Sequence, residues 1–177
     1  MADRVPDLPA LTDDCSSCAA LCCAAYPFEA HEDFAILKDM DSPCSNLANN
    51  FRCTIHPDLA IKGFGGCVAY SCAGAGQRVT QVLFDGEAWR DDPDLLTHMT
   101  HALRVLRPIH EALKVLQEAH ALPLPDALKS RAISLMAALC PPAPTSVWDF
   151  EDDAVQDALH ALPDFIDQLA PHVDASL

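Results

Sequence analysis

Apolar residues recur at helical spacing through the second half of the chain. Leucine and methionine side chains between Leu95 and Leu116 follow the three- and four-residue spacing of one helix face. Asp92 and Pro93 precede this run as a predicted N-cap and first helical residue. Pro108 lies inside the run, and we expect it to kink or split the helix because proline removes a backbone hydrogen bond.

Two more amphipathic helices are predicted downstream. The second covers residues 126–139, and the third begins around Asp149 and is interrupted at Pro163. Strand-forming residues are concentrated in residues 78–84, which predicts a short strand or an extended link there. Three helices joined by proline-containing turns bury their apolar faces most simply as an antiparallel bundle over residues 87–177.

The composition of the chain changes near its middle. Eight of the nine cysteines lie within residues 15–72, and all six glycines precede residue 87. The ninth cysteine, Cys140, stands before a proline pair and is expected to end a helix in the core. We therefore predict a flexible N-terminus (1–12), a cysteine-cluster metal-binding module (13–86) and the helical bundle (87–177).

The charge balance limits the possible partners. The chain has 11 Lys and Arg against 26 Asp and Glu, a net charge of -15, which argues against nucleic acid and against anionic membrane surfaces. Glycine is too sparse at helix starts for a phosphate-binding loop. No apolar stretch has the length of a signal peptide or a membrane span, so we expect a cytoplasmic protein with reduced thiols.

The spacing of the cysteines points to metal chemistry. Those within residues 15–72 are Cys15, Cys18, Cys22, Cys23, Cys44, Cys53, Cys67 and Cys72. If residues 15–25 are helical, the first three share one helix face and Cys23 lies about a quarter turn further round. Thiolates are soft metal ligands, and an adjacent pair suits a polynuclear cluster or two centres that divide the pair.

Two alternatives to metal binding stay open, namely cysteines as small buried hydrophobes and a disulfide-stapled module. Metal ligation is favoured because so many thiols in so short a segment exceed what packing requires. Eight thiols supply two tetrahedral ligand sets, or one cubane-type cluster with four thiols left over. Gly65 and Gly66, directly before Cys67, are expected where another part of the chain approaches the backbone closely.

A family resemblance rests on four cysteine-containing segments. They are Cys15-x2-Cys18-x3-Cys22-Cys23, Cys44-Ser-Asn-Leu47, Arg52-Cys53-Thr-Ile-His56 and Cys67-x4-Cys72. Over about residues 13–76 this pattern resembles the YkgJ-type cysteine-cluster proteins, a family described as zinc- or iron-chelating or as containing an iron–sulfur cluster. Ser45 stands where that family commonly has proline, and His56 replaces its tyrosine.

The same pattern is similar to the leading segment of some bacterial pentapeptide-repeat proteins, although this chain has no pentapeptide repeats. Either resemblance implies metal binding and does not fix a reaction. The overall prediction is a mainly α protein in which a cysteine-rich, loop-rich metal-binding module packs on a small antiparallel helical bundle.

The expected function is that of a redox or metal-handling component that holds an iron–sulfur cluster or Zn²⁺ through the eight cysteines. Two alternatives are a structural zinc module in an interaction protein and a metalloenzyme whose cluster takes part in catalysis. His56 is expected beside the centre or on the surface rather than as a ligand, and the pair His98 and His101 is expected to face solvent.

The chain beyond Pro141 carries eight acidic residues and neither Lys nor Arg. They are Asp149, Glu151, Asp152, Asp153, Asp157, Asp164, Asp167 and Asp174. This surface is either a solvated helix face or a docking surface for a basic protein partner. Trp89 and Trp148 are expected to pack in the bundle or against the cysteine module.

Overall fold

The structure is a computed structural model that describes residues 4–173 of the chain. Its helices are α1 (Leu21–Ala25), α2 (Gly65–Ala69), α3 (Ala75–Arg78), α4 (Leu95–His120), α5 (Asp126–Leu139), α6 (Asp153–His160) and α7 (Leu162–Val173). The 3-10 turns are η1 (Cys15–Ser17), η2 (His56–Asp58) and η4 (Val147–Phe150), and η3 (Val79–Leu83) is a π-helical segment. Within the described residues only isolated β-bridges occur, so the prediction of a mainly helical fold is confirmed.

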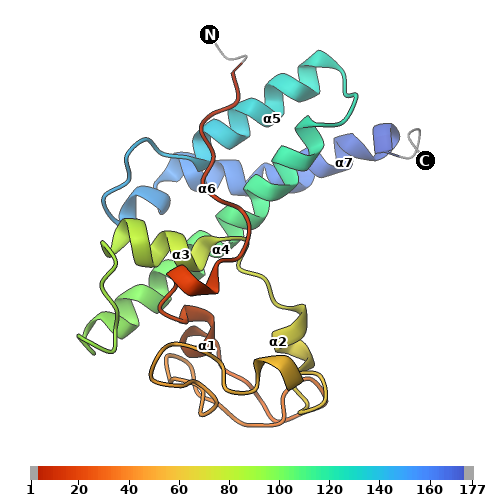
Figure 1. Cartoon of the computed structure of the whole chain (residues 1–177). Helices are drawn as coiled ribbons and strands as arrows, with labels where there is room; N and C mark the ends of the chain where they lie inside the picture. Colours follow the sequence, from red (N-terminus) through yellow and green to blue (C-terminus); the bar gives the residue numbers. More distant parts are fainter. Residues whose placement is uncertain (1–3, 174–177) are drawn as a thin grey trace.

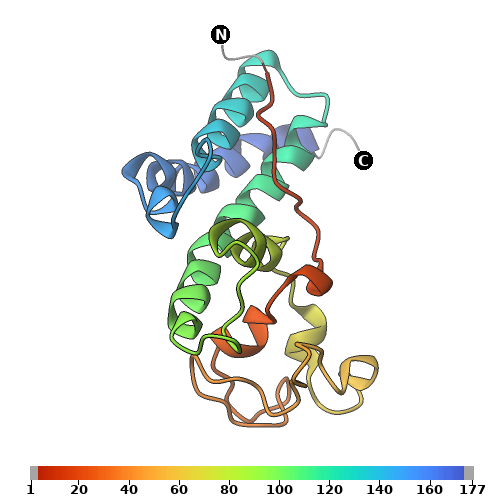
Figure 2. The same ribbon diagram turned by 60° about the vertical axis from the view of Figure 1, so that its left-hand side comes forward.

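Helix α4 extends between the two ends of the molecule (Figure 1). The long loops between α1 and α2 lie at one end and α5 to α7 at the other, and the second view shows the same division (Figure 2). Helix α4 packs against α1, α3 and η3 and also against α5, α6 and η4. One continuous hydrophobic core therefore joins residues of both sequence halves, from Leu21 and Val79 to Leu113 and Leu139.

The helices of the second half follow the sequence pattern in part, because α4 begins at Leu95 after Asp94 rather than at Pro93, and α6 begins at Asp153 rather than around Asp149. Helix α5 has the predicted bounds, and the chain breaks between α6 and α7 just before Pro163 as predicted. Of the two alternatives predicted at Pro108, a kink or a split, the split is wrong, because helix α4 continues through the proline as one element. Leu106 and Ile109, on either side of the proline, are both 0% exposed, and this packing offsets the missing hydrogen bond.

The first cysteine segment is not one helix, so the predicted helix over residues 15–25 is wrong. The chain is extended at Cys18 and left-handed at Ala20, between η1 and α1. Hydrogen bonds from distant residues replace helical ones at Ala19, whose N–H donates to Thr80 Oγ1 at 3.1 Å and whose carbonyl accepts from Trp89 Nε1 at 2.7 Å. Tertiary contacts thus override the helix propensity of the alanines.

The predicted strand over residues 78–84 is also wrong, because this segment continues from α3 into the π-helical η3. Val79 and Thr80 are adjacent and both buried, which a strand with one buried face does not allow. Trp89 is buried and donates to Ala19 of the cysteine-containing segment, as expected. Trp148, in contrast, is 73% exposed, so the packing predicted for it is wrong. Cys140 caps the end of α5 beside the core, as expected.

Among the described residues, no helix combines the length and the apolar character that crossing a bilayer requires.

Candidate metal centre

All eight cysteines predicted as ligands lie within residues 15–72. This part of the chain, the cysteine half, contains α1, α2 and the loops between them. All nine cysteines of the chain are free thiols, so no disulfide staples this half. Cys15 is exposed and the other seven are partly buried, whereas the core around them is filled by alanine, leucine and phenylalanine. The eight cysteines therefore surround the core rather than fill it, unlike small hydrophobes used for packing.

Four of these thiols form a first group, the first thiol set, which consists of Cys15, Cys18, Cys22 and Cys72. The Cys22 thiol lies near enough to Cys15 and Cys18 to interact electrostatically with both. A methyl group at Gly76 would meet the sulfur of Cys18 at 2.8 Å and that of Cys72 at 3.6 Å, so both sulfurs face the same glycine. The first turn of α3 thus brings Cys72 next to a segment that lies more than fifty residues earlier.

The other four thiols form the second thiol set, which consists of Cys23, Cys44, Cys53 and Cys67. The Cys67 thiol lies near enough to the other three to interact electrostatically with each of them. The backbone brings them together: the Cys44 N–H donates to the Cys23 carbonyl at 2.9 Å, and Cys53 pairs with Leu47 in an antiparallel bridge. The ring of Phe34 occupies the space that a side chain at Gly66 would need, which confirms the close approach predicted before Cys67.

The two sets meet at the adjacent cysteines of α1. The Cys22 thiol donates a hydrogen bond to Cys23, and this bond raises the pKa of Cys22 and lowers that of Cys23. Both lie near Cys15, but their remaining neighbours differ, because Cys22 lies near Cys18 whereas Cys23 lies near Lys38. The adjacent pair therefore belongs to two different surroundings.

Burial favours the protonated form of most of these thiols, since it raises the pKa of members of both sets, although the pKa of Cys23 is lowered. Burial raises the pKa of Cys67 to about 11, and the neighbouring thiols of its set add to the effect. Burial likewise raises the pKa of Cys72 to about 11, with a further contribution from the Asp13 carboxylate, whose Oδ1 accepts a hydrogen bond from the Cys72 sulfur at 3.2 Å. A metal ion must displace these protons, as it does at any thiolate site.

Backbone N–H groups are directed at several of the sulfurs. Burial raises the pKa of Cys18, and hydrogen bonds from the N–H groups of Leu21 and Ala20 oppose that rise. The Asn46 N–H lies 3.4 Å from the Cys44 sulfur. Because a thiolate accepts hydrogen bonds far better than a thiol, these donors favour the ionised form that binds metals.

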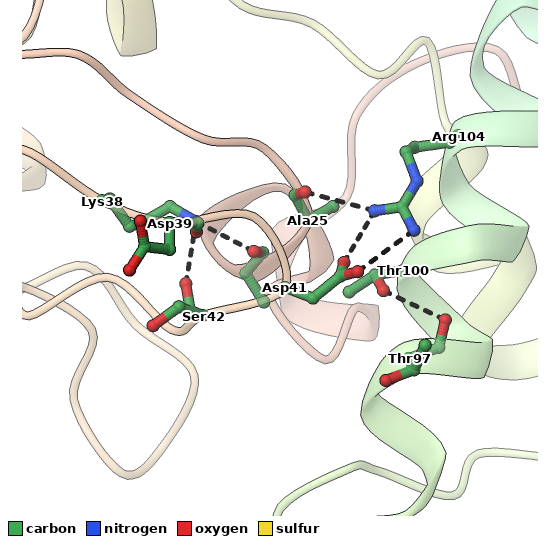
Figure 3. Close-up of polar contacts among 9 residues, drawn as sticks. Ala25, Lys38, Asp39, Asp41, Ser42, Thr97, Thr100 and Arg104 are labelled. Carbon is green, nitrogen blue, oxygen red and sulfur yellow. Dashed lines mark hydrogen bonds and ion pairs between the residues drawn. The ribbon is translucent and has the colours of Figure 1, made fainter.

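Lys38 is a buried cation beside the second thiol set, and nothing in the sequence pattern pointed to it. Lys38 is only 6% exposed, and its ammonium donates to the carbonyls of Ala24, Asp39 and Ser42 at 2.9, 3.1 and 2.8 Å (Figure 3). Burial lowers the pKa of Lys38, and the nearby Cys44 and Cys23 oppose this effect. The ammonium thus closes the loop after α1 and places a positive charge next to two of the thiols.

Arg104 fixes the same loop to α4. Its guanidinium donates to Asp41 Oδ1 at 2.7 Å and Oδ2 at 3.4 Å and to the Ala25 carbonyl at 3.2 Å (Figure 3). Burial would raise the pKa of Asp41, but hydrogen bonds from Arg104 and Thr100 outweigh it and lower the pKa. The long helix therefore positions the loop that leads to Cys44.

Tyr70 occupies the corresponding place beside the first thiol set. Its hydroxyl is buried and makes no well-formed hydrogen bond among the described residues, although the Tyr26 hydroxyl lies near enough to interact with it. Burial raises the pKa of Tyr70 far above its ordinary value, and the neighbouring Tyr26, Cys22 and Cys72 add to the effect. A buried O–H group without a well-formed hydrogen bond beside two thiols is suited to donate to a thiolate sulfur.

The histidines outside the two sets have other surroundings. His56 is exposed at the start of η2, which agrees with a position on the surface. His98 is exposed, but His101 is partly buried and its Nε2 lies 3.3 Å from Glu151 Oε1, a carboxylate that the sequence spacing had not placed there.

Part of the acidic C-terminal surface has a local structural role. The Asp149 carboxylate closes a capping box at η4, and Asp152 caps α6 by accepting from the Ala154 N–H at 3.0 Å. Asp174 lies outside the described residues. These acidic residues are therefore explained in part by helix capping, and docking of a basic partner stays a prediction.

The eight thiols suit a soft metal by their chemistry, although their present arrangement is open. Within residues 4–173, no three His, Cys, Asp or Glu side chains are placed so that they could hold a metal ion as they stand. Metal ligation therefore requires the thiol side chains of a set to move closer together. The donor type, the backbone N–H groups and the buried Tyr70 hydroxyl fit such a group.

Comparison with known proteins gives no functional class. No known protein family matches the chain, and no solved structure matches it. The chain is 45% identical over 109 residues, or 62% of its length, to the "Uncharacterized protein YybG" of Bacillus subtilis (strain 168). That alignment covers 39% of the relative, so the chain spans about two fifths of the length of the curated relative it matches.

Proposed function

We propose that this protein is a metal-binding protein that holds zinc or an iron–sulfur cluster through the eight cysteines and acts as a metal-handling or redox component. The observation that carries the proposal is that free thiols from three separated stretches of the chain lie together, around the core and not within it. Such a group satisfies the ligand preference of soft metals and of iron–sulfur clusters.

The energetics of the cysteine half support the same proposal. Between α1 and α2 the described chain has only short turns and isolated bridges, with few apolar side chains buried. A loop-rich segment of this size buries too little apolar surface to be stable without additional links. Metal–thiolate bonds supply such links, and metal binding then contributes directly to the folding free energy of this half.

Purification under oxygen-free conditions followed by elemental analysis tests the proposal. We expect either stoichiometric zinc, or iron together with absorption at about 400 nm. The metal content and the absorption spectrum thus distinguish a zinc centre from an iron–sulfur cluster. A Cys140→Ser variant is the matched control, because this thiol lies at the end of α5, apart from both sets, and its loss should leave the metal content unchanged. Protein that retains neither zinc nor iron above trace amounts, and takes up neither when reconstituted, would contradict the proposal.

Removal of the metal provides a second test. A chelator should make residues 15–72 susceptible to proteolysis, because the metal–thiolate links that order the loops are lost. Helices α4 and α5 should keep their circular dichroism signal, since they pack on each other through buried apolar residues. A proteolysis pattern that does not change after complete metal removal would count against a metal-ordered cysteine half.

A further inference from the structure

The adjacent residues Cys22 and Cys23 raise the question of how many centres the eight thiols make. Two neighbouring side chains on a helix diverge by about 100°. Here the two thiols are hydrogen-bonded to each other and both lie near Cys15, but Cys22 also lies near Cys18, whereas Cys23 lies near Lys38 and the thiols of Cys53 and Cys67. A single polynuclear cluster would bring all the ligands to one place, whereas two centres require the pair to be divided.

The surroundings of Cys22 belong to the first thiol set. Cys18 and Cys72 face each other across Gly76, where the absence of a side chain leaves room for both sulfurs. Tyr70 lies beside Cys22 and Cys72, so its buried hydroxyl is available to the same set. Helix α3, with Gly76 in its first turn, is the support on which this set is assembled.

The surroundings of Cys23 belong to the second thiol set. The hydrogen bond from the Cys44 N–H to the Cys23 carbonyl joins α1 to the loop before Cys53, and the Leu47 N–H donates to the Cys44 carbonyl at 3.0 Å. Lys38 lies beside Cys23 and Cys44. Four thiolates around a divalent cation leave a net negative charge, which a buried ammonium stabilises.

Among the described residues, two interactions cross the boundary between the two sets. They are the hydrogen bond within the adjacent pair Cys22 and Cys23 and the electrostatic interaction of Cys15 with Cys23. Within the second set, by contrast, Cys67 interacts with all three partners. The two sets are not consecutive in the sequence, because Cys72 follows all four cysteines of the second set and yet belongs to the first.

We infer that the eight thiols divide into two four-cysteine sites, one formed by the first thiol set and one by the second, and that each site binds one metal centre of the zinc class. This inference rests on the proposed function and adds to it the number of centres and the ligands of each. Tyr70 serves the first site as a hydrogen-bond donor to sulfur, and Lys38 serves the second as a buried countercharge.

Titration of the reduced, metal-free full-length protein with Zn²⁺ under oxygen-free conditions tests the inference. Native mass spectrometry should show two zinc ions per chain at saturation. Alkylation of the free thiols at increasing zinc, followed by peptide mapping, then shows which cysteines become protected together. We expect two groups of four, with Cys22 protected together with Cys18 and Cys72, and Cys23 together with Cys44 and Cys67.

Paired variants give an independent measurement. Cys18→Ser with Cys72→Ser should reduce the zinc content from two ions to one and leave the second thiol set protected. Cys53→Ser with Cys67→Ser should do the reverse. Because a serine variant can unfold a site, circular dichroism of α4 and α5 provides the folding control, and the alkylation map of the unaltered protein does not depend on either variant.

Three outcomes would overturn the inference. One zinc ion per chain, protection of all eight thiols in a single step, or protection of Cys22 and Cys23 in the same group of four would each exclude two divided sites. Failure of the wild-type chain to bind any zinc or iron is a different result, because it would remove the proposed function itself.

Discussion

His110 on α4 provides a sharp test of how the cysteine half is attached to the long helix. Its side chain is 0% exposed, its Nδ1 donates to the Ala73 carbonyl at 2.8 Å, and Nη1 of Arg78 lies 3.3 Å from its Nε2. Since the guanidinium keeps its proton, Nε2 accepts from it and the imidazole is neutral with its proton on Nδ1. Burial lowers the pKa of His110 to about 4, with Ala73 opposing the effect and Arg78 adding to it.

This pKa makes the stability of the protein depend on pH in a defined window. The imidazole of the unfolded chain has a pKa of 6.5, whereas that of the folded chain takes a proton only near pH 4. Between these values the unfolded state binds more protons, so the free energy of unfolding decreases as the pH falls. A difference of about 2.5 pH units corresponds to a loss of roughly 3 kcal/mol, complete near pH 4.

Urea denaturation between pH 7 and pH 4, followed by circular dichroism, measures this effect. We expect the wild-type protein to lose roughly 3 kcal/mol over the window. A His110→Gln variant should start lower at pH 7, by about 1 kcal/mol for the altered hydrogen bonds, and then lose much less on acidification. His98→Gln, at an exposed position of the same helix, is the matched control and should follow the wild type. Parallel curves for the wild type and His110→Gln would refute the reasoning.

Three substitutions near the thiols have separable effects. Lys38→Met should destabilise the protein by roughly 3 kcal/mol, because one buried carbonyl and two in partly buried contacts lose their donor, and a loss below about 1 kcal/mol in urea denaturation would contradict this role. Gly76→Ala should leave the free energy of unfolding nearly unchanged, since alanine favours a helix, but it displaces the Cys18 sulfur and should weaken zinc binding by about tenfold or more at the first thiol set alone. Equal zinc affinity in Gly76→Ala, measured by competition with a chelator, would show that this contact is not needed. Asp13→Asn should lower the pKa of Cys72 from about 11, because the carboxylate that opposes ionisation is gone, and the pH dependence of Cys72 alkylation measures the change.

The helices of the second half could be predicted because their signals are local. Asp126 and the leucine spacing after it define α5, and Pro163 marks the break between α6 and α7. The cysteine segment could not be predicted in the same way. Its alanines favour a helix, yet contacts of Ala19 with Thr80 and Trp89, more than sixty residues away, decide its conformation.

The candidate site was only partly visible in the sequence for the same reason. The count and spacing of the cysteines indicated a group of thiols, but the division into two sites that we infer depends on loop conformation and on Gly76, which local patterns do not encode. Lys38 and Tyr70 gave no signal, because a lysine or tyrosine in a loop is ordinarily exposed. His101 and Glu151 come together only through the packing of η4 near α4.

Helix α4 also determines which part of the chain could be transferred to another protein together with the cysteines. Leu21 and Ala25 of α1 are covered by this helix, and Arg104 and His110 on it hold Asp41 and Ala73 of the preceding chain. A gene fusion that transferred only the segment before α4 would leave this apolar surface and these polar groups without their counterparts. The smallest transferable unit thus includes the long helix, and an evolutionary exchange of the cysteine half between proteins has to carry that helix with it.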